Sequence, residues 1–278
     1  MSRPHPVGRR LLERAITTAA RRAGSPGNLR FTERQLYYET CRVLRPVPAP
    51  VRRIPYSPAP PLRLSRFTEV LRGREPAGLL PPPAAAPVTG GPPREPDLYA
   101  YGLPRLLICQ DRSIAGMLLA NHVHLEAACP VLSAEDDLPL DPRLVKSLER
   151  AEGATVHVLH DASPAGIALP ARVREGLGPV PVRVASLGLV PRHAEALRLV
   201  SGRRPGPVPP LGPMRGGLSP SEVAWLAGGR FAEVAAVPPA RLVRAVLRLT
   251  RGPRPAHRSA WSDLRDLRTA GFMTWPGP

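Results

Sequence analysis

Acidic residues follow predicted strands in the middle of the chain, where carboxylates could bind a divalent cation. Asp161 comes directly after the apolar run 154–160, and Asp111 follows the run 103–110. The carboxyl ends of parallel strands lie at one edge of a sheet, so we expect both carboxyl groups there, with acidic residues 135–137 nearby. Mg²⁺ prefers such oxygen ligands. The alternative, which the residues alone favour, is that these acids cap helices or carry solvated loop charge.

Tyr38 is a second candidate for chemistry, in the segment RQLYYETCR, residues 34–42. Residues four apart share a helix face, so Tyr38 lines up with Arg34 and Arg42, and we expect its hydroxyl to emerge among their guanidinium groups. Arginine binds phosphate oxygens through paired hydrogen bonds, which would bring the phenol to a phosphate. The alternative, which periodicity alone favours, is a surface tyrosine packed over arginine stems.

Motifs that mark several other enzyme classes are not found in the sequence. It has no GxSxG, no Gly-Lys phosphate loop and no GxGxxG after a strand. Their absence argues against the serine hydrolase, P-loop and dinucleotide-binding classes that depend on them.

The middle of the chain predicts an α/β fold, a parallel sheet with covering helices. Strands are expected at 103–110, 128–134, 154–160 and 180–187. Helices are expected at 113–125, 142–151, 164–175 and near 191–200. Regular alternation with short loops is typical of a parallel sheet. Ser163 and Pro164 are a favourable N-cap and first residue for the third helix.

The flanking segments predict helices and connectors. Residues 1–45 predict a helical, winged-helix-like module with helices at 9–23 and 32–44, the second opened by a capping box of Thr32 and Gln35. The chain then divides into a Pro-rich linker with a short helix near 63–73 (46–98), the α/β domain (99–202), and a Pro/Gly linker with a helical extension (203–278). The extension predicts weakly docked helices at 219–229, 238–251 and 262–271.

The net charge of +17 favours a polyanionic partner such as nucleic acid. Of the 39 basic residues, only Lys146 is a lysine. This bias toward arginine, together with abundant proline and alanine, is also typical of a GC-rich bacterial genome. Charge alone therefore leaves a solvated basic surface as an equal alternative.

Neither a membrane span nor a secretory signal is predicted. No run of about eighteen apolar residues occurs, and the first residues lack a continuous apolar segment. Cys41, Cys109 and Cys129 have no metal-binding spacing and resemble small hydrophobic residues of a reducing compartment. We therefore expect a cytoplasmic protein without a membrane partner.

Three segments together resemble the A subunit of topoisomerase VI and the related meiotic double-strand-break transesterase. Residues 31–39, FTERQLYYE, are similar to the winged-helix segment whose second tyrosine attacks DNA, and the match falls on Arg34 and Tyr38. Residues 106–118 and 158–167 resemble the first strand and helix of the Toprim domain and its aspartate-rich turn. Residues 184–197, VASLGLVPRHAEAL, are a weaker match to the segment after the last Toprim strand.

The chain departs from this family at the metal site. The first-strand glutamate of the family falls on Gln110, and the second aspartate of its DxD pair falls on Ser163, which leaves Asp161. In the active enzymes these acids hold Mg²⁺, which neutralises charge on the reacting phosphodiester. Asp111 could replace Gln110 only through a shift in register. We expect Mg²⁺ binding to be severely weakened.

The resemblance implies a DNA-associated protein with a Toprim-like sheet and a degenerate active site, weakly active or non-catalytic. One alternative is a magnesium-dependent DNA nuclease or transesterase that uses Tyr38 with Asp161 and Asp111. Another is an interaction or scaffold protein that does not bind DNA. The partners expected are DNA, a separate ATPase or other protein, and a second copy of the chain.

Overall fold

A four-stranded parallel sheet forms the centre of the computed structural model, which describes residues 6–45, 56–83, 102–204, 206 and 217–251. The strands are β1 (Arg105–Cys109), β2 (Val131–Ser133), β3 (Thr155–Leu159) and β4 (Arg183–Ser186). They lie in the order β2-β1-β3-β4, and every neighbouring pair is parallel. All four strands fall within the runs that the sequence predicts, so the α/β architecture is confirmed.

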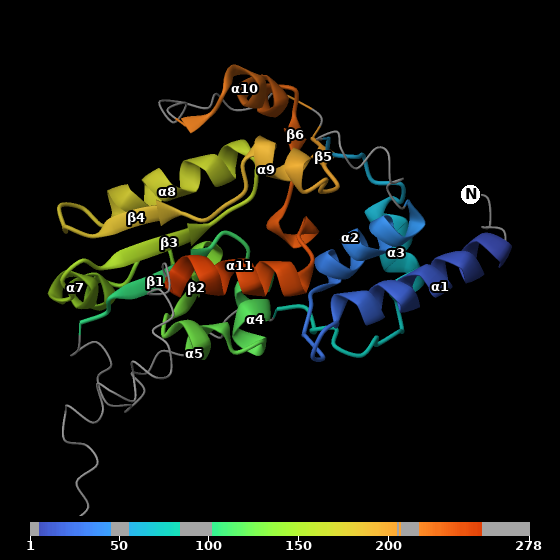
Figure 1. The fold of residues 1–278 in the computed structure, drawn as a ribbon, viewed down its shortest axis with the longest axis horizontal. Helices are drawn as coiled ribbons and strands as arrows, with labels where there is room; N and C mark the ends of the chain where they lie inside the picture. Colours follow the sequence, from blue (N-terminus) through green and yellow to red (C-terminus); the bar gives the residue numbers. More distant parts are fainter. Residues whose placement is uncertain (1–5, 46–55, 84–101, 205, 207–216, 252–278) are drawn as a thin grey trace, which may run out of the picture.

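Alternating side chains of the strands supply two separate apolar cores, because successive residues point to opposite faces. Leu106 and Ile108 pack with α7 (Pro142–Arg150) and α8 (Pro164–Gly176). Leu107 and Cys109 face the other way, toward α4 (Arg112–Ala120), and share a core with α5 (Val123–Ala127). Figure 1 shows α8 on one side of the sheet and α4 with α5 on the other. Shorter helices α6 (Ala134–Asp137) and α9 (Pro191–Ala196) complete the connections.

The N-terminal helices are α1 (Pro6–Ala23) and α2 (Glu33–Leu44). The predicted capping box is confirmed: the Thr32 hydroxyl accepts the N–H of Gln35 at 3.1 Å, and the Gln35 side chain accepts the N–H of Thr32 at 3.0 Å. The core that these helices form with each other continues into the core beside Leu107 and Cys109. The helical module therefore packs directly on the α/β part.

Residues 56–83, which the sequence assigns to a connector, are more than a spacer. Helix α3 (Leu64–Leu71) buries Phe67, Val70 and Leu71 in the same core as α1 and α2. After α3 the chain pairs with Phe31, two residues before α2: Phe31 donates its N–H to the Gly78 carbonyl and accepts the N–H of Leu80, both at 2.9 Å. The short helix predicted near 63–73 is therefore confirmed, but it packs into the core instead of only connecting two parts of the chain.

The prediction of a weakly docked C-terminal extension is wrong for its described residues. It contains α10 (Pro220–Ala227), a two-stranded antiparallel pair of β5 (Gly202–Arg203) and β6 (Arg230–Phe231), a 3-10 turn η4 (Val234–Ala236) and α11 (Pro239–Arg251). Buried side chains of this segment, among them Leu226, Val234 and Leu242, belong to the large core. Figure 1 shows α11 lying across the molecule rather than projecting from it. The helix expected at 262–271 lies outside the described residues.

None of the helices in the described ranges is long and apolar enough to cross a membrane.

Candidate functional site

The strand order creates one crevice where ligands commonly bind in open α/β sheets. The chain leaves β1 toward β2 on one side and leaves β3 toward β4 on the other, so the connections diverge between the carboxyl ends of β1 and β3. Gln110 and Asp161 lie at these two ends. The Gln110 side-chain oxygen accepts the backbone N–H of Asp161 at 3.0 Å. The predicted placement of these residues at one sheet edge is therefore confirmed.

A segment of the C-terminal part occupies this crevice. One carboxylate oxygen of Asp161 accepts the N–H of Val234 at 2.7 Å, and Ala162 exchanges two backbone hydrogen bonds with Ala232. Burial raises the pKa of Asp161 to about 7, and the nearby charges of Glu233 and Asp111 act in the same direction. The Val234 N–H and the Arg34 guanidinium oppose that rise. The carboxyl group thus holds two chain segments together at the expected ligand position.

Asp111 caps a helix. This is the role that the sequence analysis gave as the alternative to metal binding. One of its carboxylate oxygens accepts the N–H groups of Ser113 and Ile114, at 2.6 and 3.3 Å, and also the Ser113 hydroxyl at 2.6 Å. It is the N-cap of α4. The acidic residues after β2 are engaged too, since Asp136 pairs with Arg112 and Asp137 accepts the N–H of Ser133 at 2.8 Å.

Tyr38 differs from its sequence-based prediction, because its side chain is buried and only 4% exposed. Its ring lies edge-on to that of Tyr37, with centroids 5.0 Å apart. Burial raises the pKa of the Tyr38 phenol far above its ordinary value, and the Glu233 carboxylate raises it further. Arg34 remains beside the phenol, but Arg42 turns to Glu39 and to the Ala236 carbonyl. The hydroxyl therefore does not emerge among guanidinium groups, since the turn at 234–236 packs against α2 and its Ala236 carbonyl accepts a hydrogen bond from Arg42.

Glu233 is a member of this cluster that the sequence did not reveal. Its carboxylate forms a two-pronged ion pair with Arg34, in which one hydrogen bond spans 3.0 Å between Nε and Oε2. The two residues are 199 positions apart in the chain. The sequence did hold a sign that Glu233 has a partner, because Glu233 is the single acid between Phe231 and Val237 in an otherwise apolar stretch. An acid in such a run needs a partner when it is buried.

The side-chain oxygens at the sheet edge do not fit a Mg²⁺ site. Gln110, Asp111, Asp161 and Ser163 each use a side-chain oxygen to accept a backbone N–H. Within the described ranges, no three residues of His, Cys, Asp or Glu are grouped so that they could hold a metal ion. Gln110 and Ser163 stand where the family has acids, and the retained Asp161 is engaged with Val234.

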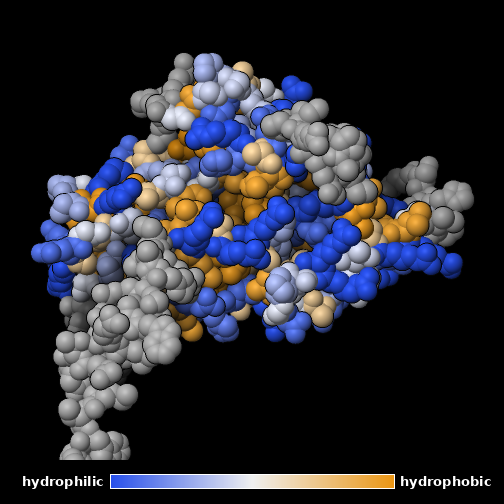
Figure 2. Space-filling model, viewed as in Figure 1, coloured by the Kyte–Doolittle hydropathy of each residue, from blue (hydrophilic) through white to orange (hydrophobic). Residues whose placement is uncertain are grey.

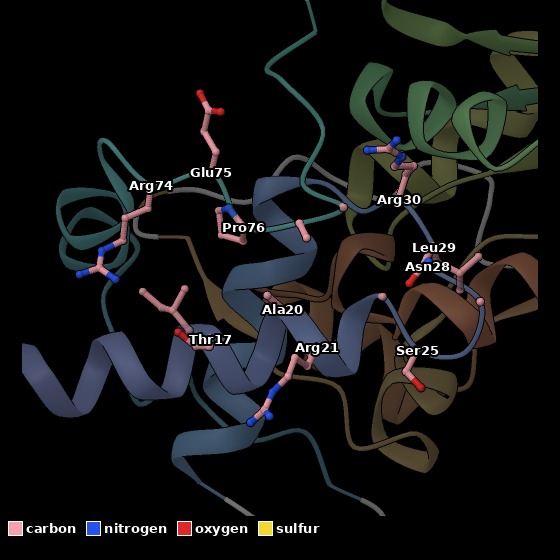
Figure 3. A pocket seen from close by; sticks show the side chains of 15 residues that line it. Thr17, Ala20, Arg21, Ser25, Asn28, Leu29, Arg30, Arg74, Glu75 and Pro76 are labelled. Carbon is pink, nitrogen blue, oxygen red and sulfur yellow. The ribbon is translucent and has the colours of Figure 1, made fainter.

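Several cavities lie near the N-terminal helices. One of about 360 Å³ borders the start of α2 and includes Arg34 and Ser113 in its lining, so it opens on the edge of the cluster. Another, of about 930 Å³, lies between α1 and the turns at 24–30 and 74–78. Its arginines do not converge: Figure 3 shows Arg21, Arg30 and Arg74 pointing in different directions. The larger cavity therefore lacks a focused anion site.

Comparisons with family models, with curated proteins and with solved structures give no match for this chain.

Proposed function

We propose that the protein is a non-cleaving DNA-binding protein related to the A subunit of topoisomerase VI, with a Toprim-like sheet and a winged-helix-like module. The observation that carries this proposal is a row of arginines on α11. Arg241, Arg244 and Arg248 are exposed, and among the described residues none of them has an acidic partner. Their spacing of three and four residues places them on one helix face.

A second group of arginines extends this basic surface along α1. Arg10, Arg14, Arg21 and Arg22 are exposed and have no ion-pair partner among the described residues. In Figure 2, hydrophilic residues gather over α11 and along α1 on the same face of the molecule. Unpaired guanidinium groups on one face are suited to the phosphates of a duplex, whereas an arginine excess from codon bias alone needs no such arrangement.

The cluster around Tyr38 supports a non-cleaving role. A nucleophilic phenol must reach a phosphodiester and lose its proton, yet the Tyr38 side chain is buried and its pKa is raised. Arg34, the residue that would bind phosphate, already pairs with Glu233. Asp161 binds the Val234 N–H where a metal would be needed. The three residues that DNA cleavage would require are therefore engaged in contacts within the fold.

DNA binding is tested by the salt dependence of duplex affinity, measured by fluorescence anisotropy between about 50 and 200 mM salt. The triple variant R241E/R244E/R248E is expected to bind more weakly and to lower the log–log salt slope by about 3, since each lost phosphate contact removes about 0.9. The control is R143E/R172E/R183E, which removes exposed arginines elsewhere on the molecule. Equal losses in both variants, or no binding by the wild type, would contradict the proposal.

The absence of cleavage is tested separately, by incubating the full chain with supercoiled plasmid and Mg²⁺ and detecting covalent adducts under denaturing conditions. We expect no adduct and no nicking. A protein–DNA adduct that disappears in Tyr38→Phe would show that the alternative, a tyrosine transesterase, is right.

A further inference from the structure

A serine and a histidine meet at the carboxyl ends of β3 and β4, next to Asp161. The Oγ atom of Ser186 lies 2.8 Å from Nε2 of His160. Ser186 is exposed, whereas the His160 side chain is 2% exposed. An exposed serine that is hydrogen-bonded to a buried imidazole is the pairing of an activated nucleophile and its base.

The direction of the hydrogen bond follows from the other ring nitrogen. Nδ1 of His160 lies 3.0 Å from the backbone carbonyl oxygen of Asp161. A carbonyl oxygen only accepts, so Nδ1 carries the proton, and in the neutral ring Nε2 is the acceptor. The Ser186 hydroxyl must therefore donate to Nε2. Burial lowers the pKa of His160, which keeps the ring neutral at physiological pH.

The backbone holds the histidine rigidly in this position. Val158 pairs with Ser186 in the sheet, and Leu189 donates its N–H to the His160 carbonyl at 2.8 Å. The ring packs so closely on Gly188 that a Cβ there would lie 2.3 Å from ring atoms. Only glycine leaves room for the imidazole beside Ser186. A general base must lie within hydrogen-bonding distance of the proton that it removes, and this packing keeps His160 within that distance of Ser186.

We propose that Ser186, with His160 as its general base and the Asp161 carbonyl as the orienting group, is a nucleophilic serine site that takes activated carboxylic esters. The site lies outside a GxSxG turn, so the sequence motif does not mark it. It is independent of DNA binding and uses no residue of the basic surface.

The reaction balances with the residues present and water. Ser186 Oγ forms a bond to the ester carbonyl carbon, its proton passes to His160 Nε2, and that proton leaves with the departing alkoxide. Water then attacks the acyl group, His160 takes the water proton, and the proton returns to Ser186 as the acid is released. Gly188 lies against the His160 ring, and its N–H makes no hydrogen bond within the described part of the chain.

The test uses the full chain and a biotinylated fluorophosphonate, which forms an O–P bond with an activated serine and expels fluoride. Peptide mass spectrometry then reads the labelled residue. Ser221, which is exposed and whose hydroxyl lies 2.9 Å from that of Ser219, is the internal comparison. We expect Ser186 to be labelled at least about a hundred-fold faster than Ser221, the low end of what a general base contributes.

Variants separate activation from mere accessibility. Ser186→Ala is expected to abolish labelling and p-nitrophenyl acetate hydrolysis, while Ser221→Ala is expected to change neither. His160→Gln should slow labelling at least about a hundred-fold. Should that variant fail to fold, labelling of the wild type in denaturing urea replaces it and should fall to the Ser221 rate. No labelling of Ser186, or labelling no faster than that of Ser221, overturns the proposal.

Discussion

Replacing Asp161 by asparagine is expected to stabilise the protein at alkaline pH and to remove part of its pH dependence. The folded pKa of Asp161 is about 7, against an ordinary value of 3.8. Between these values the folded chain holds a proton that the unfolded chain has released. Stability therefore falls as pH rises from about 4 to about 7, and the cost remains above that range.

The magnitude follows from the difference between the two pKa values. Each pKa unit corresponds to about 1.4 kcal/mol, so a difference of about 3 gives a cost of about 4 kcal/mol once Asp161 is ionised. Asparagine keeps an oxygen that can accept the Val234 N–H, which the wild type binds at 2.7 Å, but it carries no charge to bury. The variant should therefore gain up to about 4 kcal/mol over the wild type at about pH 8.

The assay is urea unfolding followed by far-UV circular dichroism, for both proteins, at intervals from about pH 4 to about pH 8. His157 and His160, whose pKa values are lowered by burial, change stability in the opposite direction as pH falls below about 6.5, and subtracting the two curves cancels them. Asp141→Asn is the control, because Asp141 is an exposed N-cap and asparagine caps equally well. A D161N curve that runs parallel to the wild type would refute the reasoning.

Two further predictions concern packing and charge, both read from urea midpoints. Gly188→Ala should cost about 1–3 kcal/mol, because its Cβ would lie 2.3 Å from the His160 ring, whereas Gly116→Ala, with open space around it inside α4, should gain up to about 1 kcal/mol. Equal effects of the two would contradict the close approach. Glu233→Gln should cost about 1–3 kcal/mol by leaving the Arg34 guanidinium without its counter-charge, and adding Arg34→Met should recover part of that loss. A double variant less stable than the single one would argue against the ion pair.

Local rules in the sequence determined the sheet and its helix starts. The β-branched and apolar run 154–160 contains β3, and Ser163 with Pro164 opens α8 as predicted. The capping box of Thr32 and Gln35 involves two residues three positions apart, so it can be predicted from the sequence without knowledge of the fold. The shared edge of Gln110 and Asp161 also followed, because parallel strands bring their carboxyl ends to one side of the sheet, whereas the hydrogen bond between them is known only from the structure.

Only the tertiary structure decided what those residues touch. Helical spacing placed Tyr38 beside Arg34 but could not reveal that Glu233, nearly two hundred positions away, lies beside both of them. The same holds for Ser186 and His160, which lie 26 residues apart and meet because β3 and β4 are neighbours. Periodicity describes one element at a time, whereas burial, ion pairing and nucleophile activation depend on which distant segment packs against it.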